Sequence, residues 1–406
     1  MRHLYTIALR LALPLILLRL WWRGRREPGY RANVQERFGI YVGDRPDKAL
    51  WVHAVSVGEA RAAAPLVRAL TSLLPDHALV MTCTTAAGRE TLKQVYGESV
   101  IAAFLPYDYP ESIQGFLERF RPRFGVLMET ELWPNLLAQC QRYRVPVALA
   151  NARMSDKSAR GYRRWRALMG PGIRGLAAVC AQSADDAGRL RALGAPRVEV
   201  TGNLKFDVTL DAAQLAAGRE WKANLGRPVL LLASTRDGEE KLLLDELGEG
   251  RFLTVVVPRH PQRFDEVAQW ADARRSRNEA PNEKTRIYLG DTMGEMAFYY
   301  AACDVAVIGG SFLPLGGQNL IEALAAGAPV VVGPSMFNFA EATRLALEAG
   351  AAIQVSDPRA AVRQAVELLK DRTKAREMAQ AGKKLCAAHR GATQRHLEIL
   401  RALAPG

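Results

Sequence analysis

The chain has 406 residues, which is enough for two domains of ordinary size. Its hydrophobic content of 49% and mean hydropathy of -0.08 exclude a multi-span membrane protein, and its net charge of +13 indicates an acidic partner such as nucleic acid, anionic lipid or a phosphorylated substrate. The five cysteines have no close pair, which excludes a zinc knuckle or a disulfide framework and favours a reducing compartment.

The first 26 residues predict a membrane anchor. Leu4 to Trp22 is mostly apolar, but Arg10, Pro14 and Arg19 interrupt it, so a helix lying in the membrane interface fits better than a clean span or a secretory signal. Aromatic anchors and cations suited to lipid headgroups follow, and they place the protein body on the cytoplasmic side. A buried N-terminal helix with a basic end is the alternative. The aromatic anchors are Trp21 and Trp22, and the cations are Arg23, Arg25 and Arg26.

The first half of the chain predicts a parallel sheet. Short apolar segments of strand length alternate with helical segments, and this alternation is typical of a doubly wound α/β domain. We therefore expect a Rossmann-like domain over residues 27–207. Its predicted strands cover residues 50–56, 78–84, 101–105, 124–128, 145–150, 176–181 and 198–202.

The second half repeats this architecture. Residues 208–226 are polar and alanine-rich and predict a linker, followed by a second Rossmann-like domain over residues 227–406 that includes C-terminal closing helices. Residues 264–273 predict a helix and residues 274–284 a surface loop. The predicted strands cover residues 228–233, 252–257, 286–289, 305–308, 330–332 and 351–355.

The pattern of residues 304–334 predicts a strand, a glycine-rich loop, a helix and a second strand. Glycines at the start of the loop, such as Gly309 and Gly310, suit a sharp bend or a close ligand. A helix expected from about Gln318 would direct free N–H groups and a positive dipole end toward an anion. Glu322, one turn into this helix, could accept hydrogen bonds from a ribose. The stretch therefore suggests a nucleotide site, with a tight strand-to-helix connection as the alternative.

Three further loops of the second half follow predicted strands, and the first of them contains Ser234–Arg236 with Glu239 and Glu240. Arg259 lies between Pro258 and Pro261, where a rigidly held guanidinium can clamp phosphate; a structural salt bridge is the alternative. Residues 290–295 form a turn whose backbone could face a base. If the sheet is parallel, these loops leave it at one edge, where ligands of open α/β sheets bind.

Three charged residues end strands of the first half. Glu59 follows the first predicted strand, Glu129 the fourth and Lys205 the seventh. A glutamate in a dry cleft can act as a general base, and a lysine can neutralise a leaving phosphate. The alternatives are a solvated glutamate in the first turn of a helix and ordinary ion pairs.

Seven short motifs in colinear order span most of the chain. They occupy Ser56–Glu59, Met128–Asn135, Asn151–Ser155, Gly202–Asp207, Val257–Pro261, Gly290–Glu295 and Gly309–Asn319. Together they resemble the 3-deoxy-D-manno-octulosonic acid (Kdo) transferases of Gram-negative lipopolysaccharide synthesis. The resemblance covers nearly the whole sequence, including the N-terminal anchor.

The resemblance implies a glycosyltransferase of the GT-B type, with two Rossmann-like domains facing a central cleft. Such an enzyme takes Kdo from CMP-Kdo, attaches it to a lipid A precursor (lipid IVA) and releases CMP. The first domain would bind the lipid and the second the sugar nucleotide. The resemblance further implies attachment to the cytoplasmic face of the inner membrane. No Asp-x-Asp motif stands at a suitable strand end, so we predict neither a metal nor another cofactor.

The resemblance also assigns roles to individual positions. Glu59 would be the general base, and Glu129 and Lys205 would stabilise the transition state. One departure is Gln318, where many relatives would have His, which leaves the role of that side chain open. The residues expected to hold the CMP part of the donor are Pro258, Arg259, Met293, Gly294, Glu295, Asn319, Leu320, Ile321 and Glu322.

Three other functions compete with this one. A different GT-B enzyme could use a UDP-sugar donor. The positive charge could instead indicate a membrane-attached protein that binds nucleic acid. The sequence lacks the mixed aromatic and basic motif of RNA-binding domains, so we expect no nucleic-acid partner. A catalytically inactive scaffold is the third.

Overall fold

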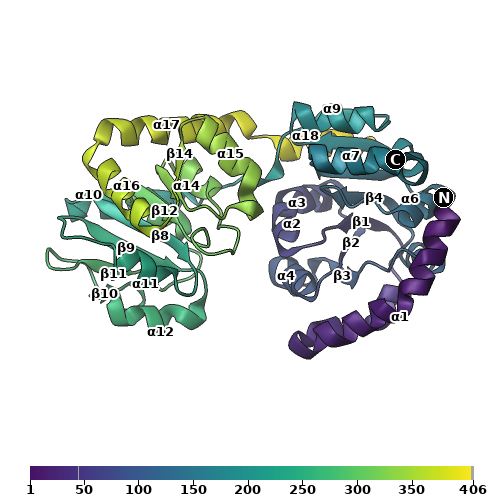
Figure 1. The fold of residues 1–406 in the computed structure, drawn as a ribbon, viewed down its shortest axis with the longest axis horizontal. Helices are drawn as coiled ribbons and strands as arrows, with labels where there is room; N and C mark the ends of the chain where they lie inside the picture. The colour runs from purple at the N-terminus through teal and green to yellow at the C-terminus, as the bar shows by residue number, and fades with distance from the viewer. Residues whose placement is uncertain (44, 404–406) are drawn as a thin grey trace. The chain divides into compact units, whose positions relative to one another are not determined.

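The computed structural model describes residues 1–43 and 45–403, which form two compact units (Figure 1). The first unit comprises Met1–Asp207 and Gly391–Gly406, and the second comprises Val208–Arg390. Within the described residues, each unit is built on one parallel sheet of seven strands. The expectation of two doubly wound α/β domains is therefore confirmed.

The sheet of the first unit has the strand order β3-β2-β1-β4-β5-β6-β7. Every strand expected in this half is present, with bounds shifted by a few residues. The strands are β1 (Ala49–His53), β2 (Ala78–Cys83), β3 (Ile101–Phe104), β4 (Pro122–Met128), β5 (Val147–Ala152), β6 (Ala178–Ala181) and β7 (Val198–Val200). The helices are α1 (Arg2–Arg26), α2 (Val57–Ala62), α3 (Ala64–Leu73), α4 (Ala86–Tyr96), α5 (Pro110–Phe120), α6 (Pro134–Arg142), α7 (Asp156–Arg164), α8 (Arg166–Arg174), α9 (Ala184–Ala192) and α18 (Ala392–Arg401).

β1 lies at the centre of this sheet and is apolar on both faces. Trp51 points to the face covered by α5, where its ring lies 5.1 Å from that of Phe116, while Leu50 and Val52 point to the face covered by α3, α4 and α18. Gly125 on neighbouring β4 makes room for Trp51, because a Cβ there would lie 2.4 Å from the indole ring. Helices on both faces explain why these strands read as continuous apolar runs.

The second unit has the strand order β10-β11-β9-β8-β12-β13-β14. Its strands are β8 (Val229–Thr235), β9 (Leu253–Pro258), β10 (Ala273–Arg274), β11 (Ile287–Leu289), β12 (Val305–Ile308), β13 (Val330–Val332) and β14 (Ala352–Gln354). Its helices are α10 (Ala212–Leu225), α11 (Glu239–Leu244), α12 (Phe264–Val267), α13 (Met296–Ala302), α14 (Ile321–Ala326), α15 (Ala340–Glu348), α16 (Pro358–Lys370) and α17 (Arg372–His389).

Three predictions for this half are wrong. The expected linker is helix α10, which packs on α13 so closely that a Cβ at Gly218 would lie 2.3 Å from the carbonyl oxygen of Phe298. The helix expected over residues 264–273 ends at Val267. Ala273, expected at the end of that helix, and Arg274, expected at the start of the surface loop, form edge strand β10. Two-residue strands have no alternating pattern long enough to recognise in a sequence.

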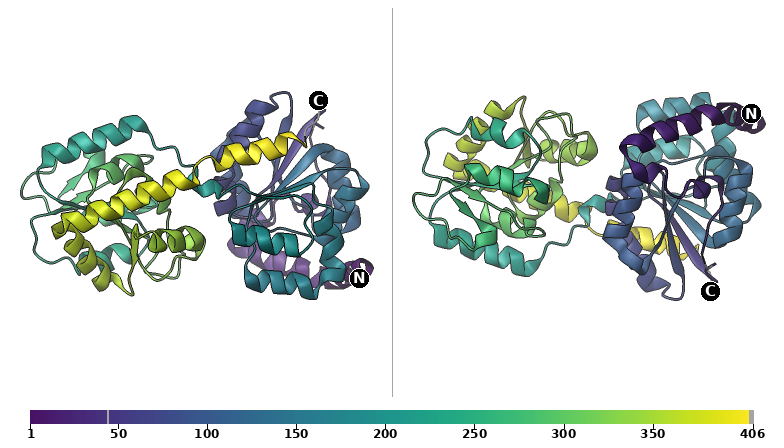
Figure 2. Two further views of the ribbon diagram at one scale, coloured as in Figure 1. Left: turned by 90° about the horizontal axis from the view of Figure 1, so that it is seen from above. Right: turned by 90° about the horizontal axis from the view of Figure 1, so that it is seen from below.

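The C-terminal helix also belongs to a different domain from the one expected. α18 packs against the first unit, where Ala392, Ile399 and Leu400 join the core beneath β1, β5 and β6 (Figure 2). The first unit therefore includes both α1, near the N-terminus, and α18, near the C-terminus. The apolar spacing of α18 indicates a buried face but does not indicate which sheet buries it.

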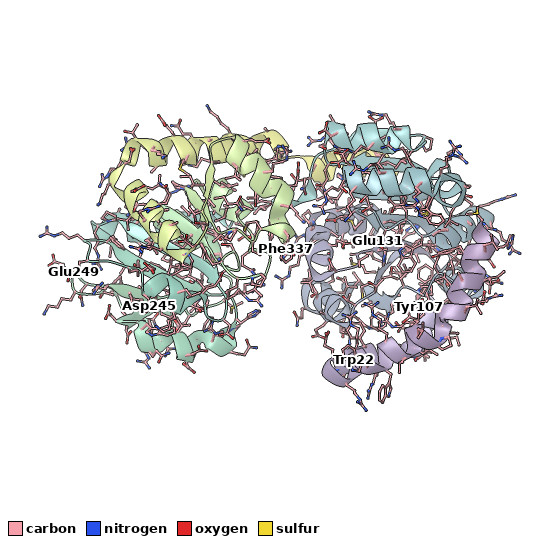
Figure 3. All side chains as sticks on the ribbon, viewed as in Figure 1. Trp22, Tyr107, Glu131, Asp245, Glu249 and Phe337 are labelled. Carbon is pink, nitrogen blue, oxygen red and sulfur yellow. The ribbon has the colours of Figure 1, made fainter. Side chains whose placement is uncertain are left out.

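Helix α1 lies along the first unit with one side and exposes the other. Thr6 is buried and bonds to Asn135, Tyr109 donates to the carbonyl oxygen of Leu9 at 2.8 Å, and Arg10 pairs with Glu111 at 3.1 Å. By length and composition the helix could cross a membrane, and only 11% of its most apolar window is buried. Its outer side forms an apolar stripe, which ends near Trp22 (Figure 3) and consists of Leu4, Ile7, Leu11, Leu15, Leu18 and Trp22.

Candidate active site

Glu59 lies in the first turn of α2, after the carboxyl end of β1. Its carboxylate accepts hydrogen bonds from the Val55 N–H at 2.9 Å and the Ser56 hydroxyl at 3.0 Å, while the Ser56 side chain caps the helix. This arrangement resembles a capping box and gives Glu59 a structural role at the start of α2, although the side chain is partly buried and is not the solvated glutamate of the alternative. However, burial and then the negative charge of Glu129 raise the pKa of Glu59 to about 7, which suits a general base at neutral pH.

Glu129 and Lys205 form an ion pair beside Glu59. The Nζ atom of Lys205 lies 3.8 Å from Oε1 of Glu129, and both side chains are about four-fifths buried, at 20% and 21% exposed. Glu129 has a left-handed backbone, with φ of 56°, and its N–H donates to the carbonyl oxygen of Ala150 at 2.9 Å. A glutamate in this conformation is uncommon and typical of functional sites. The structure thus brings together the three residues that the sequence named as catalytic.

A polar network that the sequence analysis missed holds the Lys205 turn in place. Asn151, at the end of β5 with φ of 52°, accepts from the Leu204 N–H at 2.9 Å, and Gln182 donates to the Asn151 carbonyl oxygen at 2.8 Å. His396 of α18 accepts from the Asn151 N–H at 2.9 Å, and burial lowers the pKa of this histidine to about 4. Asn151 stood within a recognised motif, but His396 lies 245 positions away.

The glycine-rich loop of the second unit is built as expected, but its helix is shorter. Gly310, Gly316 and Gly317 have positive φ, and a Cβ at Gly309 would lie 2.5 Å from the Cα of Thr235. α14 starts at Ile321, not at Gln318, and has six residues. A strong N-terminal dipole site is therefore wrong for this helix. Any phosphate contact here would come from the loop backbone.

The buried side chain of Glu239 holds the glycine-rich loop in place. Its side chain is fully buried, and its carboxylate accepts hydrogen bonds from the N–H groups of Gly310 at 2.5 Å, Phe312 at 3.0 Å and Arg236 at 2.9 Å. Three backbone donors satisfy the buried charge. Glu239 was expected in a loop at the end of a predicted strand, but its contact with the glycine-rich loop was not predicted.

We expect Glu239→Ala to destabilise the second unit by about 2–4 kcal/mol, because one buried and two partly buried N–H groups would lose their acceptor. Glu239→Gln keeps one acceptor oxygen and should have a smaller effect. Glu249→Ala, at an exposed glutamate of the same unit, is the control. Urea unfolding measures the loss, and amide exchange at Gly310 and Phe312 locates it. Equal stability of the Glu239→Ala and Glu249→Ala variants would contradict this account.

Asn319 and Glu322 lie on one side of the loop end. The Asn319 side chain donates to Oε1 of Glu322 at 2.9 Å and accepts from the Ile321 N–H at 3.0 Å. The Tyr300 hydroxyl on α13 donates to the Asn319 carbonyl oxygen at 3.4 Å. Leu320 and Ile321 are fully buried, so they support the shape of this loop end from within the core.

The remaining donor-binding candidates follow β9 and β11, which neighbour each other in the sheet. Arg259 is half-buried, and its N–H donates to the carbonyl oxygen of Thr235 at 2.9 Å, directly after Pro258 at the end of β9. Met293 is 57% exposed and Gly294 has φ of 83°. Glu295 binds Arg275 at 2.9 and 3.2 Å, and this pairing lowers the pKa of Glu295. A base contact from this turn would therefore use its backbone more readily than the Glu295 carboxylate.

Two cavities lie away from these residues. One of about 320 Å³ is lined by Phe252 and Ile287, and one of about 430 Å³ by Asp304 and Pro329, which all stand at the amino ends of strands. Within residues 1–43 and 45–403, no three His, Cys, Asp or Glu side chains are placed to hold a metal ion. Metal independence stays a prediction.

The family model and the relatives to which this chain is similar carry the same description. Residues 32–208 match the family model of 3-deoxy-D-manno-octulosonic-acid transferase (kdotransferase), and residues 273–385 match that of glycosyl transferases group 1. The chain is 46% identical over 424 residues to the 3-deoxy-D-manno-octulosonic acid transferase of Bordetella pertussis and 36% identical over 420 residues to that of Haemophilus influenzae. Each alignment covers 98% of both chains.

Among solved structures, the UDP-GlcNAc 2-epimerase of Neisseria meningitidis bound to UDP-GlcNAc has a TM-score of 0.56 and 17% identity. The match covers 87% of this chain and 100% of the epimerase. At this identity the likeness concerns the fold alone.

Proposed function

This chain belongs to the 3-deoxy-D-manno-octulosonic acid (Kdo) transferases, glycosyltransferases of lipopolysaccharide core synthesis, and from this premise we propose that it transfers Kdo from CMP-Kdo to a lipid A precursor such as lipid IVA. The observation that carries the proposal is Glu59, whose pKa lies near neutrality beside the Glu129–Lys205 pair. The first unit would bind the lipid and the second the sugar nucleotide.

In the proposed reaction Glu59 takes the proton of the acceptor hydroxyl. The resulting oxygen attacks the anomeric carbon of Kdo, a new glycosidic bond forms, and the bond from that carbon to the phosphate of CMP breaks. A carboxylate with a pKa near 7 is deprotonated in a large fraction of molecules at neutral pH and is still basic enough to accept the proton. Lys205, oriented by Glu129, would stabilise negative charge that develops in the transition state.

CMP leaves as a phosphate monoester, whose charge must be stabilised. Arg259 can supply a guanidinium, and the glycine-rich loop, which Glu239 fixes through the Gly310 and Phe312 N–H groups, leaves room for the phosphate to approach its backbone. The Asn319–Glu322 pair offers an amide and a carboxylate to a ribose diol. Pro258, Met293, Gly294, Glu295, Leu320 and Ile321 would contribute mainly through their backbone and by shaping the site.

We also propose that α1 holds the enzyme on the cytoplasmic face of the inner membrane by lying in the interface. Its contacts through Thr6, Leu9 and Arg10 keep it along the first unit, and the apolar stripe faces outward. At its C-terminal end, Arg25 lies over the ring of Trp21 at 4.0 Å and Arg23 over that of Tyr30 at 4.5 Å. Such pairs are suited to the headgroup region.

Removing part of this stripe should release the protein from membranes. We expect Leu11→Ala with Leu15→Ala to lower partitioning onto anionic vesicles at least tenfold, because each buried CH₂ contributes about 0.8 kcal/mol to membrane binding. Both side chains are exposed, so folding should be unchanged. Ile40→Ala with Val42→Ala removes similar exposed apolar surface outside α1 and serves as the control in vesicle co-sedimentation. Unchanged partitioning of the α1 variant would contradict the proposed anchor.

The function itself is tested by product analysis. The purified protein is incubated with CMP-Kdo or with UDP-hexoses and a tetra-acylated lipid A precursor, and the lipids are analysed by mass spectrometry. We expect a mass increase of one or more Kdo residues with CMP-Kdo alone. Transfer from a UDP-hexose would instead favour the competing UDP-sugar enzyme, and no transfer from either would favour a scaffold.

A further inference from the structure

The outer side of α7 carries a row of cations. Lys157, Arg160 and Arg164 are spaced three and four residues apart, so they share one side of α7, and Arg153 lies in the loop that leads from β5 into this helix. The opposite side packs inward through Ala159, which is buried. All four cations are exposed, and within the described part of the chain their side chains have no ion-pair or hydrogen-bond partner. We call these four residues the α7 basic row.

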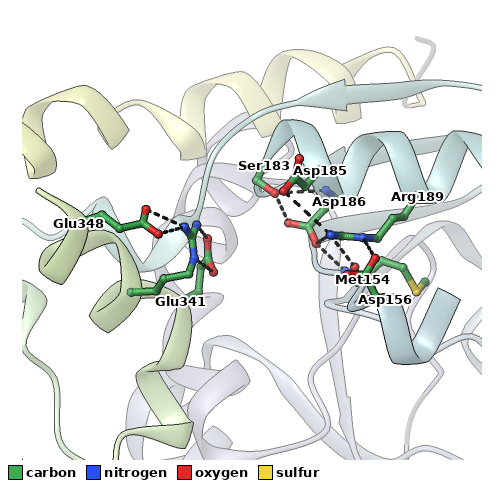
Figure 4. A network of polar contacts seen from close by, with 9 residues as sticks. Met154, Asp156, Ser183, Asp185, Asp186, Arg189, Glu341 and Glu348 are labelled. Atoms are coloured by element: carbon green, nitrogen blue, oxygen red, sulfur yellow. Dashed lines mark hydrogen bonds and ion pairs between the residues drawn. The ribbon is translucent and has the colours of Figure 1, made fainter.

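The acidic residue of α7 does not neutralise this row. Asp156 accepts a hydrogen bond from Arg189 of α9 at 2.7 Å, and the same arginine donates to the carbonyl oxygen of Met154 at 3.2 Å, while Asp186 accepts from the Met154 N–H (Figure 4). Asp156 is 69% exposed and lies one turn before Arg160, but its ion pair is made with Arg189 of α9. Like charges at this spacing destabilise a helix, and cations near its N-terminus oppose the dipole. An anionic ligand would relieve this repulsion.

The end of α7 adds an aromatic side chain to these cations. Trp165, directly after the helix, is 53% exposed and is flanked by Arg164 and Arg166. An exposed tryptophan beside arginines is suited to a surface that is partly apolar and partly anionic. Soluble nucleotides and metal cations do not match this combination, whereas a phosphorylated glycolipid does.

α7 is connected to the candidate active site. The hydroxyl of Tyr162 donates to the carbonyl oxygen of Thr130 at 3.3 Å, and Thr130 directly follows Glu129. Arg153 directly follows β5, at the same edge of the sheet as the ends of β1 and β4. A ligand on the α7 basic row would therefore lie on the edge of the unit where the acceptor hydroxyl must be activated.

We propose that the α7 basic row binds a phosphate monoester of the acceptor glycolipid and thereby orients its hydroxyl toward Glu59. This inference rests on the proposed function and adds to it a subsite with a stated ligand chemistry. Several cations can share one phosphate dianion by charge-assisted hydrogen bonds, and arginine suits its geometry. The row would then act on acceptor affinity more than on the chemical step.

The test uses the full chain in detergent micelles, so that membrane attachment does not contribute. Lys157→Gln, Arg160→Gln and Arg164→Gln are combined in one variant, and transfer is measured with the phosphorylated acceptor and with the same acceptor after phosphatase treatment. Arg372→Gln, Lys374→Gln and Arg376→Gln, at exposed positions of α17, remove the same charge from the second unit as a control.

We expect the α7 variant to raise KM for the phosphorylated acceptor at least tenfold with little change in kcat, and to leave KM for the dephosphorylated acceptor at the wild-type value. The α17 control should match wild type with both acceptors. An equal loss with both acceptors would overturn the proposal and assign the row to general lipid attachment. An unchanged KM would overturn it as well. Failure of the wild-type enzyme to transfer Kdo would instead contradict the proposed function.

Discussion

Glu59→Gln should reduce Kdo transfer by about 10²–10⁴-fold, the range that loss of a general base produces. Glutamine keeps an oxygen that can accept from the Val55 N–H or the Ser56 hydroxyl, so the start of α2 should remain folded. Alanine would remove both the base and the cap and would mix a catalytic effect with a loss of stability of about 0.5–2 kcal/mol. Glutamine is therefore the more informative replacement.

The control for this prediction is Glu98→Gln, which removes an exposed carboxylate of the same unit and should leave transfer unchanged. Binding of CMP-Kdo, measured by calorimetry, should be the same in all three proteins, because Glu59 acts on the acceptor. A Glu59→Gln enzyme that keeps a tenth or more of wild-type kcat would show that Glu59 is only a helix cap.

The pH dependence gives a second, independent test of Glu59. The base must be deprotonated, so kcat/KM of the wild type should fall as pH decreases through about 7. Burial and then the charge of Glu129 raise this pKa. Glu129→Gln removes the second cause, so the acidic limb of the normalised profile should move to lower pH. A limb that stays in place would contradict the electrostatic coupling of the two glutamates.

Lys205→Ala should lower kcat by about 10²–10³-fold, a loss typical of removing one group that stabilises developing charge. Lys205 is mostly buried beside Glu129, in a turn that Asn151 fixes through the Leu204 N–H. Its ammonium is therefore held in position before the substrate binds. Steady-state transfer assays with saturating acceptor measure the effect.

Two variants separate charge from packing at Lys205. Lys205→Arg keeps a cation and should retain more activity than Lys205→Ala, whereas Lys93→Ala, at an exposed lysine of α4, should behave as wild type. Because Lys205 and Glu129 form a pair, the double variant should lose less than the sum of the single losses in free energy. Full additivity would indicate that the pair does not act as a unit.

The sequence determined the fold class and most of the strands because buried parallel strands are short, apolar runs with abrupt ends. The predicted bounds of β12 agree with the structure at both ends, Val305 and Ile308. The predicted strand ends in turn located the loops that follow them. The same reasoning located Glu59, Glu129 and Lys205 at strand ends. Parallel strands present their carboxyl ends at one edge, so strand order along the chain was enough to predict a common site.

Only the tertiary structure decided which groups support that site. His396 accepts a hydrogen bond from Asn151 although 245 positions separate the two residues. Glu239 accepts from the N–H groups of Gly310 and Phe312, which lie 71 and 73 positions further along the chain. A local pattern cannot encode such contacts, because they depend on the packing of whole elements. The assignment of α18 to the first unit is of the same kind.

The protonation of Glu59 illustrates this division. The sequence left two possibilities open for Glu59: a solvated glutamate in the first turn of a helix, whose charged form the dipole would stabilise, and a general base in a dry cleft, whose pKa burial would raise. Burial and the nearby charge of Glu129 outweigh that local effect and raise the pKa to about 7. Side-chain identity therefore determined which proton acceptor is present, and the surroundings assembled by the fold decided the pH at which it can work.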